Sequence, residues 1–307
     1  MRNRRSIRDL SVALALSALI VIGGALGFSL VGSPQTASGK LQVMTSFYPL
    51  HFFASQIGGE KAQVGQLIPD NTEPHAWDPR PSDIIRTDRS SIFIYNGAGF
   101  EPWAESFISS LVTRHIIVDT SVGLVSPSGP SLTRMDPHFW LDPLSAEVQV
   151  DNILAGFFEA DPANAAYYQA NADRLKSRLD QLNVAFLDGL QNRTKNDIIT
   201  THEGFDYMAN RYGFQAHAAV GIGGDQQPSP ADLTALADLV RNLNLHYVFS
   251  EPIFSDAVML TIASETGAQV LVLDGVHGRT GVHAGMDYFQ IMYENLKNLR
   301  IGLEVSP

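Results

Sequence analysis

From residue 41 onward, short apolar runs typical of β-strands alternate with segments whose apolar positions recur every three or four residues, as in helices. Strands are predicted at residues 41–47, 62–68, 91–95, 115–118, 197–201, 215–220, 246–250 and 269–273. Helices are predicted at residues 49–57, 81–86, 102–111, 204–212, 230–243, 255–266 and 286–299. Alternating strands and helices form parallel sheets covered on both faces, so the pattern predicts an α/β protein with two lobes.

The alternation pauses in the middle of the chain. Asp161-Pro162 is typical of a helix start. Apolar residues then follow at helical spacing: Ala165, Tyr168, Ala172, Leu175, Leu179, Leu182, Phe186 and Leu190. About 29 helical residues would form a rod of roughly 43 Å. The helix could pack on one lobe, or it could be a rigid connector spanning both, and its position at the pause favours the connector.

The predicted organisation therefore has four parts. Residues 1–40 form a signal peptide or N-terminal anchor, 41–160 the first α/β lobe, 161–191 the linker helix and 192–307 the second lobe. Four arginines between Arg2 and Arg8 precede an uncharged run over residues 10–32, which could cross a bilayer core ~30 Å thick. Ala37-Ser38-Gly39 offers a cleavage site. We expect an exported protein, periplasmic or at the cell surface, either cleaved or anchored through residues 10–32.

Composition and charge restrict the partners of this chain. Of its 307 residues, 45% are hydrophobic and 17% charged, as in a globular protein with a substantial core. Beyond residue 40, 16 basic residues face 31 acidic ones, which excludes a basic nucleic-acid-binding face. The chain has no cysteine, so a metal ion could find only nitrogen and oxygen ligands.

Two short motifs nearly repeat each other 63 residues apart: EPHAWDP at residues 73–79 and DPHFWLDP at residues 136–143. Each places one histidine, His75 or His138, beside a tryptophan and a proline-flanked aspartate. A histidine on a proline-stiffened turn has lost much of its freedom before a ligand arrives, which suits a metal site.

Four candidate metal ligands follow predicted strands: His75, His138, His202 and Asp274. Ligands in open α/β sheets bind at the carboxyl ends of strands, and each lobe contributes two of these residues. Three imidazoles and one carboxylate form a tetrahedral set that Zn²⁺ favours. Taken singly, each residue is more often a surface, cap or turn residue. The repeated motif and the placement in two lobes together favour the metal site. The other histidines are expected to have no metal role, although that of His277, three residues after Asp274, stays open.

Two further segments have more than one interpretation. Glu251 could orient an imidazole from outside the ligand set, or it could be an ordinary turn residue. The glycine-rich stretch at residues 96–103 lacks the lysine and spacing of a phosphate loop, so we interpret it as a strand–helix turn with aromatic residues.

Segments 45–50, 73–79, 96–103, 136–143 and 265–274 together resemble the zinc/manganese solute-binding proteins of ABC importers (cluster A-I). The resemblance covers residues 41–305. It implies two α/β lobes joined by a rigid helix, with one metal ion held between them by His75, His138, His202 and Asp274. Zinc members tend to have histidine at the third ligand position, where manganese members have glutamate.

This chain departs from the family pattern in two places. Residues 124–134 lack the histidines and acids of the loop that many zinc members carry. After Asp274, where the family often has proline, this chain continues Gly275-Val276-His277.

The expected function is extracytoplasmic, high-affinity Zn²⁺ binding and delivery to the membrane permease of an ABC importer, by a monomer that is not an enzyme. A Mn²⁺ receptor is the alternative within the family. A zinc hydrolase would need an open coordination position and a base, whereas the chain has no H-E-x-x-H motif and Asp274 would close the fourth position. A metal-binding adhesin on the same scaffold is the third alternative.

Overall fold

The computed structural model describes residues 39–124, 136–224 and 227–306. The predicted signal or anchor over residues 10–32 lies outside these ranges, as does nearly all of the segment 124–134. No helix within the described ranges combines the length and the apolar character needed to cross a membrane.

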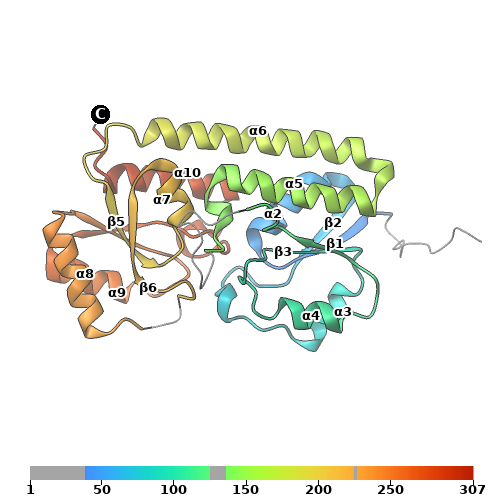
Figure 1. Ribbon diagram of the computed structural model, residues 1–307, viewed down its shortest axis with the longest axis horizontal. Coiled ribbons are helices and arrows are strands. Elements are labelled where there is room, and N and C mark those ends of the chain that lie inside the picture. Colours follow the sequence, from blue (N-terminus) through green and yellow to red (C-terminus); the bar gives the residue numbers. More distant parts are fainter. Residues whose placement is uncertain (1–38, 125–135, 225–226, 307) are drawn as a thin grey trace, which may run out of the picture.

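The N-terminal lobe is built on a parallel four-stranded sheet with the strand order β2-β1-β3-β4. Its strands are β1 (Leu41–Thr45), β2 (Ala62–Gln66), β3 (Ile92–Tyr95) and β4 (Ile116–Asp119). Its helices are α2 (Tyr48–Gly58), α3 (Pro81–Thr87), α4 (Ala104–Ser110) and α5 (Pro143–Ala160). In Figure 1, α2 and α5 cover the upper side of the sheet and α3 and α4 lie below it.

The C-terminal lobe repeats the parallel strand–helix pattern. Strand β5 (Asp197–His202) pairs with β6 (Gln215–Val220), and β7 (Tyr247–Ser250) pairs with β8 (Gln269–Val272). Strands β5 and β7 lie side by side, so the two pairs continue one another. The helices of this lobe are α7 (Asp206–Tyr212), α8 (Pro230–Asn242), α9 (Ala257–Thr266) and α10 (Tyr288–Gly302). Capping boxes begin α8, at Ser229 and Asp232, and α10, at Asp287 and Gln290.

The long helix α6 (Ala165–Gly189) runs along both lobes (Figure 1). It packs on α2 and α5 of the N-terminal lobe and on α10 of the C-terminal lobe. The structure therefore confirms the connector interpretation, and packing on one lobe alone is wrong. The reason lies in its apolar stripe, which is buried from Tyr168 to Phe186 and so needs a partner along the whole helix.

The predicted start of this helix is wrong in detail. Asp161 ends α5, and a 3-10 turn (Pro162–Asn164) precedes the first residue of α6, Ala165. The carboxylate of Asp161 accepts a hydrogen bond from the Tyr168 hydroxyl at 2.7 Å and does not cap the helix. The helix α5 had not been predicted as a separate element, because its apolar positions merge in sequence with those of α6.

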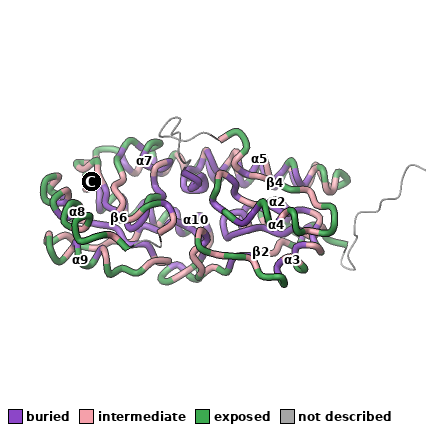
Figure 2. Tube along the Cα trace, turned by 60° about the horizontal axis from the view of Figure 1, so that its bottom comes forward, coloured by how far each residue is buried: buried purple, intermediate pink, exposed green. Residues whose placement is uncertain are grey.

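Buried side chains form one large apolar cluster that continues from the N-terminal sheet through α6 to α10. A second, smaller cluster lies between β5, β7 and the helices α8 and α9. Figure 2 shows buried residues inside both lobes and between them, whereas much of the surface of α8 and α9 is exposed. The two lobes thus share a core along the side that α6 covers.

Polar contacts also join the lobes next to the second histidine motif. The Trp140 indole Nε1 donates to the carbonyl of Gly275 at 2.7 Å, and the Tyr288 hydroxyl donates to the carbonyl of Trp140 at 2.5 Å. Arg211 of α7 forms a bidentate ion pair with Asp142, with Nη2 and Oδ2 2.6 Å apart. These contacts fix the second motif against the C-terminal lobe.

Candidate metal centre

His75 lies on a 3-10 turn (Pro74–Ala76) in the loop that follows β2. The carboxylate of Glu73 caps this turn, because it accepts hydrogen bonds from the backbone N–H groups of His75 at 3.0 Å and of Ala76 at 2.7 Å. The Phe100 ring packs edge-on against the imidazole, with centroids 4.6 Å apart. Turn and ring together fix the direction in which His75 points.

His138 is fully buried just before the 3-10 turn Phe139–Leu141. One oxygen of Asp136, Oδ1, accepts from the His138 backbone N–H at 2.9 Å and from Nδ1 at 2.7 Å. Burial raises the pKa of Asp136 to about 6, while the hydrogen bond from the His138 backbone opposes the rise. With its Nδ1 hydrogen held by this carboxylate, the imidazole has Nε2 as the nitrogen that can bind a metal ion.

His202, the last residue of β5, is oriented in the same way from another element. Oε1 of Glu251, which directly follows β7, accepts from the His202 backbone N–H at 3.0 Å and from Nδ1 at 2.7 Å. Burial raises the pKa of Glu251, and the neighbouring His202 opposes the rise. Of the two interpretations of Glu251, the structure shows the orienting one.

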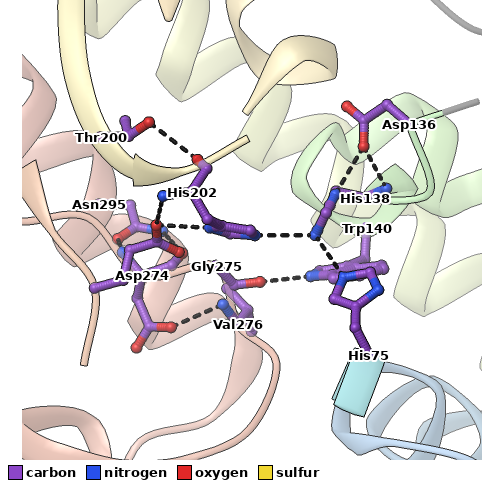
Figure 3. Close-up of polar contacts among 11 residues, drawn as sticks. His75, Asp136, His138, Trp140, Thr200, His202, Asp274, Gly275, Val276 and Asn295 are labelled. Carbon is purple, nitrogen blue, oxygen red and sulfur yellow. Dashed lines mark hydrogen bonds and ion pairs between the residues drawn. The ribbon is translucent and has the colours of Figure 1, made fainter. Parts of the chain in front are cut away.

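The Nε2 atoms of these three histidines meet between the lobes (Figure 3). His75 Nε2 lies 3.5 Å from His138 Nε2, which in turn lies 3.1 Å from His202 Nε2. With Zn–N bonds of about 2.0–2.1 Å, neighbouring nitrogens of a tetrahedral site lie about 3.3–3.4 Å apart. Both observed separations lie within about 0.3 Å of this value, and His138 is the histidine that they have in common.

Asp274, the fourth residue predicted from the sequence, is buried but engaged elsewhere. Its Oδ2 lies 2.6 Å from Nδ1 of His283, and its Oδ1 accepts from the Val276 backbone N–H at 2.7 Å. In Figure 3 the carboxylate points toward Val276. Among the described residues, the groups with possible metal donors within 4.8 Å of one another do not include Asp274. The structure therefore brings together three of the four predicted residues.

His277 lies in the cluster instead. It belongs to two such groups, one with His75 and His138 and one with His202 and Glu251. Its ring centroid lies 5.3 Å from that of His138 and 5.2 Å from that of His202. Burial and the neighbouring imidazoles lower its pKa well below the ordinary value, which keeps the ring neutral. The available signal in the sequence was that His277 follows Asp274 by three residues, in the segment where this chain departs from the family pattern.

The backbone of Gly204 passes directly beside the donor atoms. A Cβ atom there would lie 2.6 Å from Nε2 of His202 and 3.2 Å from Cδ2 of His138. A cavity of about 460 Å³, lined in part by residues of β5 and β6, borders His202 and Gly204. Gly204 has no signature in the sequence, since a glycine after a strand is ordinary until its distance to the imidazoles is known.

Comparison with known proteins agrees with this architecture. Residues 43–302 match the family described as zinc-uptake complex component A, periplasmic (ZnuA). The high-affinity zinc uptake system protein ZnuA of Bacillus subtilis is 33% identical over 291 residues, which span 90% of this chain and 91% of that protein.

Two solved structures share the fold at similar coverage. The metal-dependent lipoprotein YcdH of Bacillus subtilis has 34% identity and a TM-score of 0.76, covering 86% of this chain and 99% of its own. The Zn(II)-bound ZnuA-like domain of Streptococcus pneumoniae AdcA has 28% identity and a TM-score of 0.76, covering 87% and 100%. This chain spans 56% of the whole AdcA polypeptide. The chain therefore belongs to the periplasmic zinc-uptake component A family.

Proposed function

We propose that this protein is an extracytoplasmic Zn²⁺ receptor that captures the ion between its lobes and hands it to the membrane permease of an ABC importer. The observation that carries the proposal is the position of His138 Nε2, which lies at near-tetrahedral separations from His75 Nε2 on one side and from His202 Nε2 on the other. Relatives named for high-affinity zinc uptake and zinc binding support the same ion.

The donor types favour zinc over manganese as the ligand. Imidazole nitrogen suits Zn²⁺, whereas Mn²⁺ is better served by carboxylate, carbonyl and water oxygens. In this cluster the carboxylates of Asp136 and Glu251 contact the Nδ1 atoms of histidines and so act on the imidazoles. We therefore propose Zn²⁺ as the bound ion and keep a Mn²⁺ receptor as the second candidate function.

Capture fits the site better than catalysis does. A zinc hydrolase needs a base placed beside a metal-bound water. Glu73, the acid two residues before His75, accepts hydrogen bonds from the backbone of His75 and Ala76 and holds the turn that carries a ligand. A carboxylate in that role orients the site and is poorly placed to take a proton from water.

We further propose that the chain works as a monomer, with lobes at residues 41–160 and 192–307 joined by the linker 161–191. Residues 1–40 would direct export, followed either by cleavage or by anchoring through residues 10–32. Relatives named as lipoproteins and periplasmic components support the extracytoplasmic location.

Metal analysis combined with direct competition tests the proposed function. Protein exported by a bacterial host and purified without chelator should contain close to one zinc ion per chain. After the metal is removed, equal concentrations of Zn²⁺ and Mn²⁺ should load zinc almost exclusively. Recovery of manganese, or equal loading of the two ions, would contradict the zinc assignment.

A further inference from the structure

Among residues 39–124, 136–224 and 227–306, neither ring nitrogen of His277 has a hydrogen-bond partner, although only 2% of its surface is exposed. A buried imidazole without a partner forfeits the hydrogen bonds it would make in water, which costs about 1–3 kcal/mol. Its donor atoms nevertheless lie within 4.8 Å of those of His75 and His138. Burial without hydrogen bonds, close to other imidazoles, is expected of a side chain that binds the same metal ion as those histidines.

The loop that carries His277 is held in place by its neighbours. Val276 has a backbone φ of 54°, which a β-branched residue rarely adopts. The Asp274 carboxylate accepts from its N–H, and the Trp140 indole holds the carbonyl of Gly275. The two contacts hold both polar groups of the Gly275–Val276 peptide, one residue before His277.

Asp274 therefore has a use other than metal binding. Its two oxygens contact Val276 N and His283 Nδ1 at 2.7 and 2.6 Å, so a metal ion would have to share an oxygen that already accepts a hydrogen bond. Within the described residues, the ring nitrogens of His277 make no hydrogen bond that would compete with a metal ion. The backbone carbonyl and N–H of Asp274 are also fixed by Asn295, at 2.8 Å each, which opposes a shift of the chain toward the cluster.

We propose that His277, and not Asp274, supplies the fourth donor, so that the ion is held by four imidazoles. The proposal rests on the function proposed above and extends it to the ligand set. Asp274 becomes a positioning residue that holds the loop of His277. Four neutral ligands leave the full charge of Zn²⁺ on the site, and the buried carboxylates of Asp136 and Glu251 on the imidazole Nδ1 atoms offset part of it.

Glu251 has a second oxygen suited to this arrangement. Its Oε2 is buried and has no hydrogen-bond partner in the described part of the chain. A Cβ atom built on Gly275 would lie 3.0 Å from this oxygen and 2.8 Å from His277 Nδ1, so the two atoms flank the same glycine. With Nε2 of His277 on the metal, Glu251 Oε2 is available to accept the Nδ1 hydrogen.

X-ray absorption at the zinc edge of the loaded protein tests the ligand set, because imidazole rings give a distinct multiple-scattering signal. We expect four imidazoles in the wild type, three in His277→Phe, and four in Asp274→Asn. Phenylalanine keeps a ring of similar size in the buried site, next to Phe100, whose ring lies parallel to that of His277 at an interplanar angle of 7°. Asparagine keeps an acceptor for the Val276 N–H.

Zinc titration against a competing chelator gives the matching affinities. We expect His277→Phe and His277→Ala to bind at least ~10–100-fold more weakly, and Asp274→Asn to lose less than tenfold. His246→Ala is the control for histidine removal, because His246 is exposed and pairs with Glu304 away from the cluster.

The outcomes separate this inference from the proposed function. Three imidazoles in the wild type, with His277→Phe binding as tightly as the wild type, would overturn the four-imidazole site and leave the zinc receptor intact. A wild type that binds no zinc would overturn the proposed function itself. Thermal unfolding of each metal-free variant shows whether it is folded, and either His277 variant suffices for the affinity test.

Discussion

At the scale of single residues, His138 and His202 are held in the same way. For each histidine, one oxygen of a neighbouring carboxylate accepts hydrogen bonds from both its backbone N–H and its Nδ1. Each pair of bonds fixes the backbone and the ring together, so that Nε2 is aimed before an ion arrives. Such preorganisation removes part of the ordering cost of binding.

Changing the partner of one imidazole should weaken binding without removing a ligand. Glu251→Gln keeps an oxygen acceptor but removes the charge that makes His202 a stronger donor, so zinc affinity should fall by about 10–100-fold. The matched control is Glu304→Gln, which alters a carboxylate 2.7 Å from Nδ1 of the exposed His246. Calorimetric zinc titration of both variants checks this. Equal affinities for the two would mean that Glu251 has no influence on the site.

A methyl group at Gly204 should obstruct the donor atoms. In Gly204→Ala the new Cβ would lie 2.6 Å from His202 Nε2, closer than packed atoms allow, so the imidazole must turn away. We expect zinc affinity to fall by at least about tenfold, comparable with the loss of a supporting contact.

Gly221→Ala is the control for Gly204→Ala, because no atom lies within 4 Å of its Cβ position and the residue lines the same cavity. The measurement is zinc competition with a chromophoric chelator. An unchanged affinity for Gly204→Ala would show that the metal does not bind at this face of His202.

At the scale of elements, the long helix α6 contributes to stability because it is buried against both lobes. Leu182 is completely buried on its inner face, whereas Leu187 on the same helix is 46% exposed. Leu182→Ala should therefore lower the free energy of unfolding by about 2–5 kcal/mol. Leu187→Ala should change it by less than about 1 kcal/mol. Chemical denaturation of the two variants checks the difference, and equal losses would mean that α6 is not packed as described.

Most elements could be predicted from the sequence. Every predicted strand lies within two residues of the observed one at each end, since strand patterns are local. The exact start of α6 could not be predicted, because Asp161-Pro162 is typical of a helix start and here precedes a 3-10 turn, Pro162–Asn164. The start at Ala165 depends on contacts such as that of Asp161 with Tyr168.

The site could be predicted in part for a related reason. His75 and His138 stand in recognisable motifs, and Asp136 lies two residues from the histidine that it orients. Glu251 lies 49 residues from His202 and meets it only because β5 and β7 are neighbours. The choice between Asp274 and His277 depends on the backbone at Val276 and on the partner His283, neither of which has a sequence signature.

At the scale of the whole molecule, the shared core and α6 restrict how the lobes can move. A continuous helix packed on both lobes should limit the change on binding to local loop ordering and small tilts. We expect the radius of gyration of apo and zinc-loaded protein, measured by small-angle X-ray scattering, to differ by less than about 1 Å. A contraction of several ångströms would contradict the role of α6 as a strut. Zinc added to His138→Ala provides the control for non-specific effects of the ion.

The central claim is that imidazoles from both lobes bind one zinc ion. Calorimetric titration of the metal-free protein with Zn²⁺ tests it most directly when the wild type is compared with His138→Ala from the N-terminal lobe and His202→Ala from the C-terminal lobe. The account predicts one ion per wild-type chain and a loss of at least ~10–100-fold in affinity for either variant. Zinc binding of unchanged affinity and stoichiometry in His138→Ala or His202→Ala would contradict it.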